Sequence, residues 1–337
     1  MDMCNDKLNA VIGTNIVEVF KKYSVLFLLG FFIVVASLVS SNFFSLSNFL
    51  NLLQSYAAPG VIAIGMTFTI LSSGTDLSVG SFAALGGMVS ALLLTRGLPV
   101  GLCVVIAVIV GSLLGTVNGL IITFFNMTPF IVSLATMVSI RGLAMLTTDG
   151  KVISGLIKLG KDGASGAAFC FLGGGTITAA GARIPVAGIT WILLTVITAY
   201  VLRYTMFGRG LYAIGGNREA AMLSGMRVKL FNTLAWTVSG MTSAYAGVML
   251  TAWLTVAQPT LAAGFELDAI AATVIGGTAM SGGKGGVIGT FAGVFILAII
   301  TNLFNLMGLP SYYQQIFKGI IIVAALLLNQ FVSREID

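Results

Sequence analysis

The chain has 337 residues, of which 57% are hydrophobic and only 8% are charged. A soluble protein carries roughly a quarter charged residues, and a globule in water must cover its surface with polar groups, so this composition excludes a soluble fold. The net charge is +6, but without a run of like charges or a basic aromatic face it does not indicate nucleic acid binding. The apolar stretches are long and continuous, unlike the alternating strands of a membrane β-barrel. We therefore predict an all-α, polytopic integral membrane protein.

Apolar segments long enough to cross a bilayer follow one another through most of the chain. A spanning helix needs about 20 residues, so the chain has room for about ten, some of them short or broken. Lys21 and Lys22 precede the first segment and Arg334 follows the last, so both termini are expected in the cytoplasm. Residues 42–53 are amphipathic and predict a short helix along the outer interface. The expected spans are about 23–40, 57–72, a third ending near 94, 100–124, a fifth ending near 146, 189–204, 230–256, 268–280, 287–306 and 312–331.

Two long segments between the spans differ in charge. Residues 147–188 are polar and rich in glycine, and they are too polar to span and too long for a tight connection. The helix count makes them an extracytoplasmic loop. Residues 205–229 form the most basic loop, with Glu219 as its one acid. Because basic residues accumulate in cytoplasmic loops, we expect this loop in the cytoplasm.

The basic loop contains a short predicted helix with a signal at each end. Asn217 is a good N-cap residue, and Glu219 would favour the positive end of the helix dipole. Residues 220–223 would form the helix, and Gly225 would end it. Such a helix in the cytoplasm suits a groove on a partner protein, although an ordinary connector is the alternative.

Two apolar segments are interrupted by small polar residues in a similar way. The first is 71–87, with its break at 72–74, and the second is 274–293, with its break at 281–283. Paired interrupted segments can mark a transport path built from repeats. The alternative is chance likeness between glycine-rich helices, because the chain contains 42 glycines.

Charged side chains in or near the spans are candidates for a path, because each costs a few kcal/mol at the bilayer centre unless it faces protein or water. Asp76 either caps the helix after the first break or contacts substrate. Arg141 is expected to point inward and pair with a carboxylate or backbone carbonyls. Glu266 and Asp268 either cap a helix or face the outer mouth of a cavity, while Lys318 either snorkels outward or lines the path. The candidates for the path or its helix breaks are Asp76, Ser78, Arg141, Glu266, Asp268, Gly282, Gly283 and Lys318.

The sequence contains no recognisable motif for catalysis, nucleotide binding or a metal site. The run 282–286 lacks the spacing of a P-loop and its closing Lys-Ser/Thr pair. Histidine is absent, and Cys4, Cys103 and Cys170 have no pair spacing. We therefore expect no enzyme, no metal and no cofactor in this chain, so a partner would have to hydrolyse any ATP.

The run 65–81, GMTFTILSSGTDLSVGS, resembles the signature of ribose-type ABC permeases, the simple-sugar family. Residues 212–225 resemble the cytoplasmic coupling loop of that family. Further similar segments follow in order over nearly the whole chain, whereas the glycine-rich residues 163–181 depart from the pattern. These similar segments are the run ending at Leu53, 264–271, 274–278, 281–284 and 312–314.

The resemblance implies one permease domain over residues 1–337, in an ATP-driven importer of the bacterial cytoplasmic (inner) membrane. It implies a second permease copy or a paralogue, and a separate ATP-binding subunit that holds ATP and Mg²⁺. A periplasmic or lipid-anchored sugar-binding protein would deliver the monosaccharide, a ribose-like pentose or a hexose. The residues on which the ATPase would dock are Gly215, Gly216, Asn217, Glu219, Ala220, Ala221, Ser224 and Gly225.

Two other kinds of function compete with this interpretation. An ion-coupled secondary transporter of small polar solutes would need acidic or histidine relays within its spans, and here histidine is absent and such acids are few. A membrane-embedded enzyme would need a catalytic constellation, which the sequence does not show.

Overall fold

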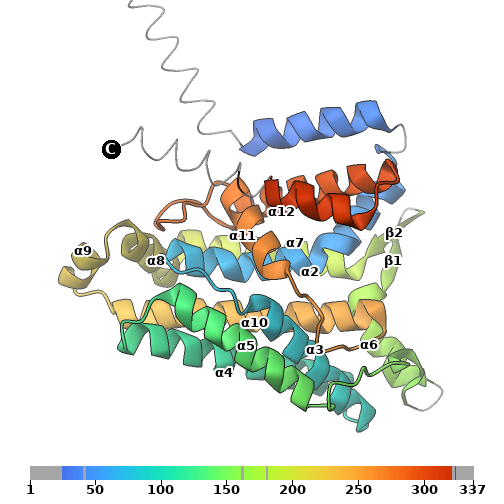
Figure 1. Cartoon of the computed structure of the whole chain (residues 1–337), viewed down its shortest axis with the longest axis horizontal. Helices are drawn as coiled ribbons and strands as arrows, with labels where there is room; N and C mark the ends of the chain where they lie inside the picture. Colours follow the sequence, from blue (N-terminus) through green and yellow to red (C-terminus); the bar gives the residue numbers. More distant parts are fainter. Residues whose placement is uncertain (1–24, 41–42, 161–162, 180, 321–322, 324–337) are drawn as a thin grey trace, which may run out of the picture.

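The computed structural model describes residues 25–40, 43–160, 163–179, 181–320 and 323, most of which are helical (Figure 1). The predicted start of the first span, the end of the last span, and Lys21, Lys22 and Arg334 lie outside the described residues. The helices are Val25–Val39, α2 (Leu46–Leu71), α3 (Val79–Thr95), α4 (Val100–Phe124), α5 (Pro129–Leu146), the 3₁₀-helix η1 (Leu156–Lys158), α6 (Ala164–Gly174), α7 (Val186–Tyr204), α8 (Met206–Gly216), α9 (Arg218–Leu223), α10 (Val228–Leu254), α11 (Phe265–Ile275), α12 (Val287–Leu306) and residues 311–320.

Helices suited to a bilayer make up much of the described chain. Five are long and apolar enough to cross it, namely α2, α4, α5, α7 and α12, while Val25–Val39, α3 and α6 are apolar but shorter. Large apolar side chains such as Leu113 of α4 and Val138 of α5 point outward, and extended apolar surface of this kind marks contact with a membrane. The larger number of about ten spans stays a prediction.

Helix α10 packs against α2, α3 and α4, and Figure 1 shows it between α2 on one side and α4 on the other. Small residues on α10 let its neighbours approach to backbone contact. A Cβ on Gly240 would lie 2.3 Å from the carbonyl oxygen of Gly111, and one on Gly247 would lie 1.8 Å from that of Ala83. In lipid, such close packing rather than hydrophobicity holds helices together.

One predicted boundary is wrong at the start of α2. Residues 42–53 were expected to lie along the interface as a separate helix, but Leu46–Leu71 is one helix of 26 residues with Pro59 inside it. It begins where the Ser45 hydroxyl accepts the Asn48 amide at 3.2 Å. Leu52 and Leu53 are already buried, so tertiary packing, which the local pattern does not show, extends the helix.

Two further predictions need correction. The eighth span was expected over 268–280, but α11 runs Phe265–Ile275 and ends at Gly276, because Gly277 adopts a φ of +84° that only glycine tolerates readily. The fold is also not entirely helical. β1 (Thr176–Ala179) and β2 (Ala182–Pro185) form an antiparallel pair, with Thr176 opposite Pro185. This hairpin, η1 and α6 give structure to the segment that was expected to be an irregular loop.

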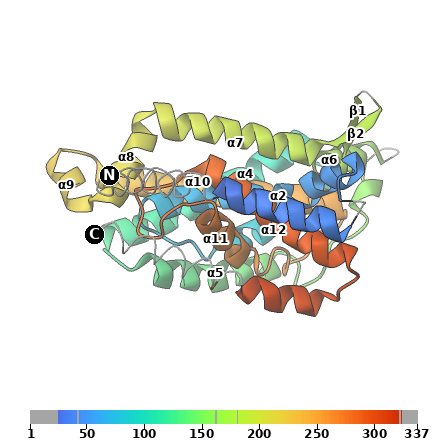
Figure 2. The same cartoon turned by 90° about the horizontal axis from the view of Figure 1, so that it is seen from above.

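The two long connecting segments lie at opposite ends of the helices. Figures 1 and 2 both place α8 and α9 at one end of α10, and α6 with the β1–β2 hairpin at the other. This arrangement is what the predicted cytoplasmic loop 205–229 and extracytoplasmic loop 147–188 require.

The contact between α4 and α10 predicts that Gly240→Ala lowers stability by about 1–3 kcal/mol, because its methyl group would overpack the interface. Thermal unfolding in detergent, followed by tryptophan fluorescence, measures the effect. Gly142→Ala is the matched control, since no atom lies within 4 Å of its Cβ position and alanine favours a helix by about 0.5–1 kcal/mol over glycine. Equal losses in both variants would contradict direct backbone packing.

Candidate functional site

Helix α9 has both of its ends where the sequence predicts them. The Asn217 side-chain oxygen accepts the amide of Ala220 at 2.9 Å, as an N-cap does. Gly225 follows the helix with a φ of +82°. The amides of Gly225 and Met226 donate to the carbonyls of Met222 and Ala221, at 3.1 and 3.2 Å. This pair of bonds is a Schellman motif, which satisfies carbonyls at a helix end.

Helix α9 presents an apolar surface away from the helices while one residue anchors it. Met222 and Leu223 are 62% and 85% exposed. Ala221 is only 4% exposed and packs with Ile214 of α8 and Val228 of α10. Glu219, Ala220 and Ser224 are exposed beside them. The helix is therefore a small projection attached firmly to both neighbouring helices, which is a suitable shape for docking.

The two helix breaks that the sequence paired lie against each other. The amide of Gly283 donates to the carbonyl of Leu71 at 3.1 Å. The Ser73 hydroxyl donates to the carbonyl of Ser281 at 2.7 Å. Gly282 and Gly283 both have positive φ, which suits them to this tight connection. The Leu71 carbonyl at the break after α2 therefore finds its hydrogen-bond donor in the loop between α11 and α12.

Helix α8 contacts this junction directly and leads into α9. A Cβ on Gly215 would lie 2.0 Å from the Leu71 oxygen and 2.3 Å from the Gly283 nitrogen. One turn earlier, the Tyr212 hydroxyl donates to the carbonyl of Gly285 at 2.8 Å. Burial raises the pKa of this phenol, so it stays protonated as a donor. A displacement of α9 would therefore reach both helix breaks through α8.

Asp76 lies wholly buried just after the first break and is held by hydrogen bonds. Its carboxylate accepts the amide and hydroxyl of Ser78, and the hydroxyl of Ser239 in α10. Asn118 of α4 then donates to the Ser78 hydroxyl at 3.1 Å and accepts from Thr136 of α5 at 2.6 Å. The N-cap residue of α3 is Ser78, so Asp76 fixes the residue that begins the helix and does not cap the helix itself. The network joins the start of α3 to α4, α5 and α10.

The other charged candidates gather around the start of α11. Arg141 donates to the carbonyls of Pro259 and Leu261, at 2.9 and 2.8 Å, as the sequence predicts. Glu266 accepts the amide of Gly264 at 3.1 Å. Lys318 forms an ion pair with Asp268, a carboxylate 50 residues away in the chain, at 2.9 Å, so its ammonium group is directed at another of the charged candidates.

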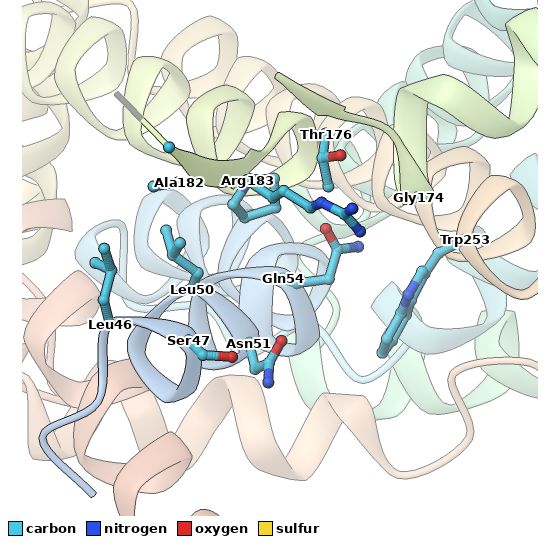
Figure 3. Close-up of a pocket in the computed structure, with 12 residues that line it drawn as sticks. Leu46, Ser47, Leu50, Asn51, Gln54, Gly174, Thr176, Ala182, Arg183 and Trp253 are labelled. Atoms are coloured by element: carbon cyan, nitrogen blue, oxygen red, sulfur yellow. The ribbon is translucent and has the colours of Figure 1, made fainter. Parts of the chain in front are cut away.

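A polar cavity at the end opposite α9 was missed by the sequence analysis. It has a volume of about 460 Å³ and lies between the first turns of α2, the β1–β2 hairpin and Trp253 (Figure 3). Figure 3 shows the Gln54 amide and the Arg183 guanidinium directed toward the same space. Ser47, Asn51 and Gln54 recur at i, i+4 and i+7, which puts them on one helix face. That spacing was the signal, but it needed a continuous helix to be recognised.

The junction beneath α8 predicts different outcomes for two adjacent glycines. Gly215→Ala would force its methyl group between the Leu71 oxygen and the Gly283 nitrogen, and we expect a loss of about 1–3 kcal/mol of stability. Hydrogen exchange of a peptide covering residues 276–286 should also become faster. Gly216→Ala is the control, because nothing lies within 4 Å of its Cβ position. Unchanged exchange in the Gly215 variant would show that the junction does not depend on this contact.

Comparison with known proteins places the chain in a family. Residues 48–326 match the model described as "branched-chain amino acid transport system / permease component". The ribose import permease protein of Haemophilus influenzae is 39% identical over 335 residues, 99% of each chain. That of Bacillus subtilis is 43% identical over 304 residues, 90% of this chain and 91% of its own. The D-allose transport system permease protein of Escherichia coli K12 is 33% identical over 317 residues, 93% of each.

No solved structure matches the chain. The sequence relatives nevertheless extend over nearly its full length, and they also cover nearly the full length of their own chains. The chain belongs to the ribose-type, simple-sugar family of ABC transporter permeases.

Proposed function

We propose that the chain imports a monosaccharide across the bacterial cytoplasmic membrane while a separate partner subunit hydrolyses ATP with Mg²⁺. A ribose-like pentose is the first choice and a hexose the second, since the relatives are named for ribose and for D-allose. The observation that carries the proposal is the connection of exposed α9, through Gly215 of α8, to the junction of two helix breaks. Such a connection can pass work from a motor to a path through the membrane.

The ATP-binding subunit is proposed to dock on α9 and the residues beside it. Met222 and Leu223 would enter an apolar groove on that subunit, because aliphatic anchors in a pocket typically dominate such contacts. Glu219 lies in the first turn of α9, where its charge complements the helix dipole. The 205–229 loop and both termini are then cytoplasmic, and the basic residues of the loop agree with this orientation.

The opposite end of the molecule is then extracytoplasmic. A periplasmic or lipid-anchored sugar-binding protein would meet the 147–188 segment there, next to the polar cavity of Figure 3. The path itself would be completed by a second copy of the permease or by a paralogue. Arg141, Glu266, Asp268 and Lys318 are proposed to border its outer part, since they gather around the start of α11.

The bonding of the acidic residues bears on the alternative of an ion-coupled transporter. Asp76 accepts three hydrogen bonds and Asp268 pairs with Lys318. A proton relay needs carboxylates that can exchange partners with water or substrate, and these two are held by fixed protein donors. The arrangement therefore favours a path driven by an external motor.

Uptake in proteoliposomes tests the proposal. The permease is reconstituted with its ATPase and binding protein, and entry of labelled D-ribose is followed with ATP, without ATP, and without the binding protein. We expect uptake only when both partners and ATP are present, with D-allose as a competitor. Uptake by the permease alone, driven by a proton or sodium gradient, would overturn the importer assignment.

Two substitutions in the coupling segment should separate ATP hydrolysis from transport. Glu219→Arg puts a positive charge at the positive end of α9, and Gly225→Trp forces a bulky residue into positive φ. We expect uptake to fall about tenfold, within the range of a lost coupling free energy, while membrane insertion is retained and ATP hydrolysis continues. Gly142→Ala, which lies in α5 outside the coupling loop and meets no neighbour, is the control. Normal uptake in both variants would remove α9 from this role.

A further inference from the structure

A second cavity, here called the basic cavity, lies at the α9 end of the molecule, between the last turn of α7, the start of α8 and the start of α12. Its volume is about 470 Å³, and its wall includes Arg203, Arg209 and Tyr212. Arg203 lies in the last turn of α7 and Arg209 lies in α8. Two different helices therefore each contribute an arginine to the lining of one cavity.

Within the part of the chain that the structure describes, no carboxylate forms an ion pair with the arginines of this cavity. Both arginine side chains are exposed. Arg203 instead lies over the ring of Tyr204, with 5.4 Å between its guanidinium carbon and the ring centroid. Two guanidinium groups on one cavity favour an anion, and phosphate is the anion their donor geometry suits best.

An apolar groove continues from the basic cavity along the helices. It has a volume of about 960 Å³, and it shares Gly276, Ile288 and Gly289 with the cavity. Its remaining lining is almost wholly apolar and comes from Val25–Val39, residues 43–53, α7 and α12. A free anion would occupy only the cavity, whereas a molecule with a charged head and hydrocarbon tails would fill both the cavity and the groove.

The site lies where candidate membrane spans end. α7 ends at Tyr204 and α12 begins at Val287. Tyr200 and Tyr204 are 62% and 57% exposed on the last turns of α7, as aromatic residues are at a membrane interface. Ile288, at the boundary between cavity and groove, is 70% exposed. The cavity therefore opens at headgroup level and the groove at acyl-chain level.

We propose that this composite site binds an anionic phospholipid of the cytoplasmic leaflet, its phosphate between Arg203 and Arg209 and its acyl chains in the groove. The assignment to that leaflet rests on the orientation given under Proposed function. Basic pockets between helices on the cytoplasmic side are suited to such headgroups. Because Tyr212 lines the same cavity and bonds to Gly285, a bound headgroup would contact the helix that carries α9.

Retention of phosphatidylglycerol by the purified permease–ATPase complex tests the site. The complex is placed in nanodiscs of phosphatidylcholine with added phosphatidylglycerol, and retained lipid is counted by native mass spectrometry. We expect the wild-type complex to keep one phosphatidylglycerol per permease. The double variant Arg203→Gln/Arg209→Gln should bind it about 30-fold more weakly, because it removes two contacts with the phosphate of about 1 kcal/mol each.

The matched control is Arg218→Gln/Arg227→Gln, which removes the same charge from exposed residues of the same loop that do not line the cavity. It should retain the lipid like the wild type. An equal loss of phosphatidylglycerol in both double variants would mean that general surface charge causes the effect, and it would overturn the site. A wild-type complex that retains no phosphatidylglycerol would also overturn the site.

Two further measurements distinguish the phosphate of a lipid headgroup from free inorganic phosphate. Inorganic phosphate at millimolar concentration should not displace the lipid, and displacement would instead assign the cavity to a free anion. Ala292→Phe, which narrows the groove, should weaken lipid retention with both arginines present. Retention is measured without transport, so its absence beside normal sugar uptake would overturn this site and leave the importer assignment intact.

Discussion

A backbone carbonyl that is buried where a helix breaks needs a hydrogen-bond donor from elsewhere in the protein, and much of this structure follows from that constraint. The break after α2 leaves the Leu71 carbonyl without a helical partner, and the Gly283 amide binds it. The loop between α11 and α12 must therefore stay close to the end of α2. That requirement fixes where α8 can pack, and only a glycine at position 215 leaves enough room. The position of α8, and of α9 that follows it, thus depends on the hydrogen bonding of one carbonyl.

Asp76 extends the same logic from the backbone to a side chain. A buried carboxylate is tolerated when hydrogen-bond donors surround it, and Ser78 and Ser239 provide them. The result is a polar connection through an interior that is otherwise mostly apolar. Through Asn118 and Thr136, this connection also includes α4 and α5. Separate helices are thereby held in register where glycine contacts alone would permit sliding.

The sequence predicted elements whose signals are local. The apolar runs 100–124 and 287–306 coincide with α4 and α12, and α9 begins and ends at its Asn217 and Gly225 signals. Features made by distant residues could not be predicted in this way. The polar face of α2 looked interfacial because the hairpin that covers it lies more than a hundred residues away in the chain. Likewise, the sequence left two interpretations open for Lys318, because nothing local identifies Asp268 as its partner. The likeness of the two helix breaks was visible in the sequence, but the contact between them depends on the tertiary structure.

The uninterrupted course of α2 has a mechanical consequence. Its 26 residues extend about 39 Å at 1.5 Å per residue, which exceeds a hydrocarbon core of about 30 Å. Its first turns line the cavity with Ser47 and Asn51, and its last carbonyl meets the loop beneath α8. A single helix, long enough to cross the hydrocarbon core, therefore joins the polar cavity to the loop beneath α8, with Pro59 as its natural point of bending. A movement at the cavity and a movement at the loop beneath α8 would therefore act on the same helix, with no further element between them.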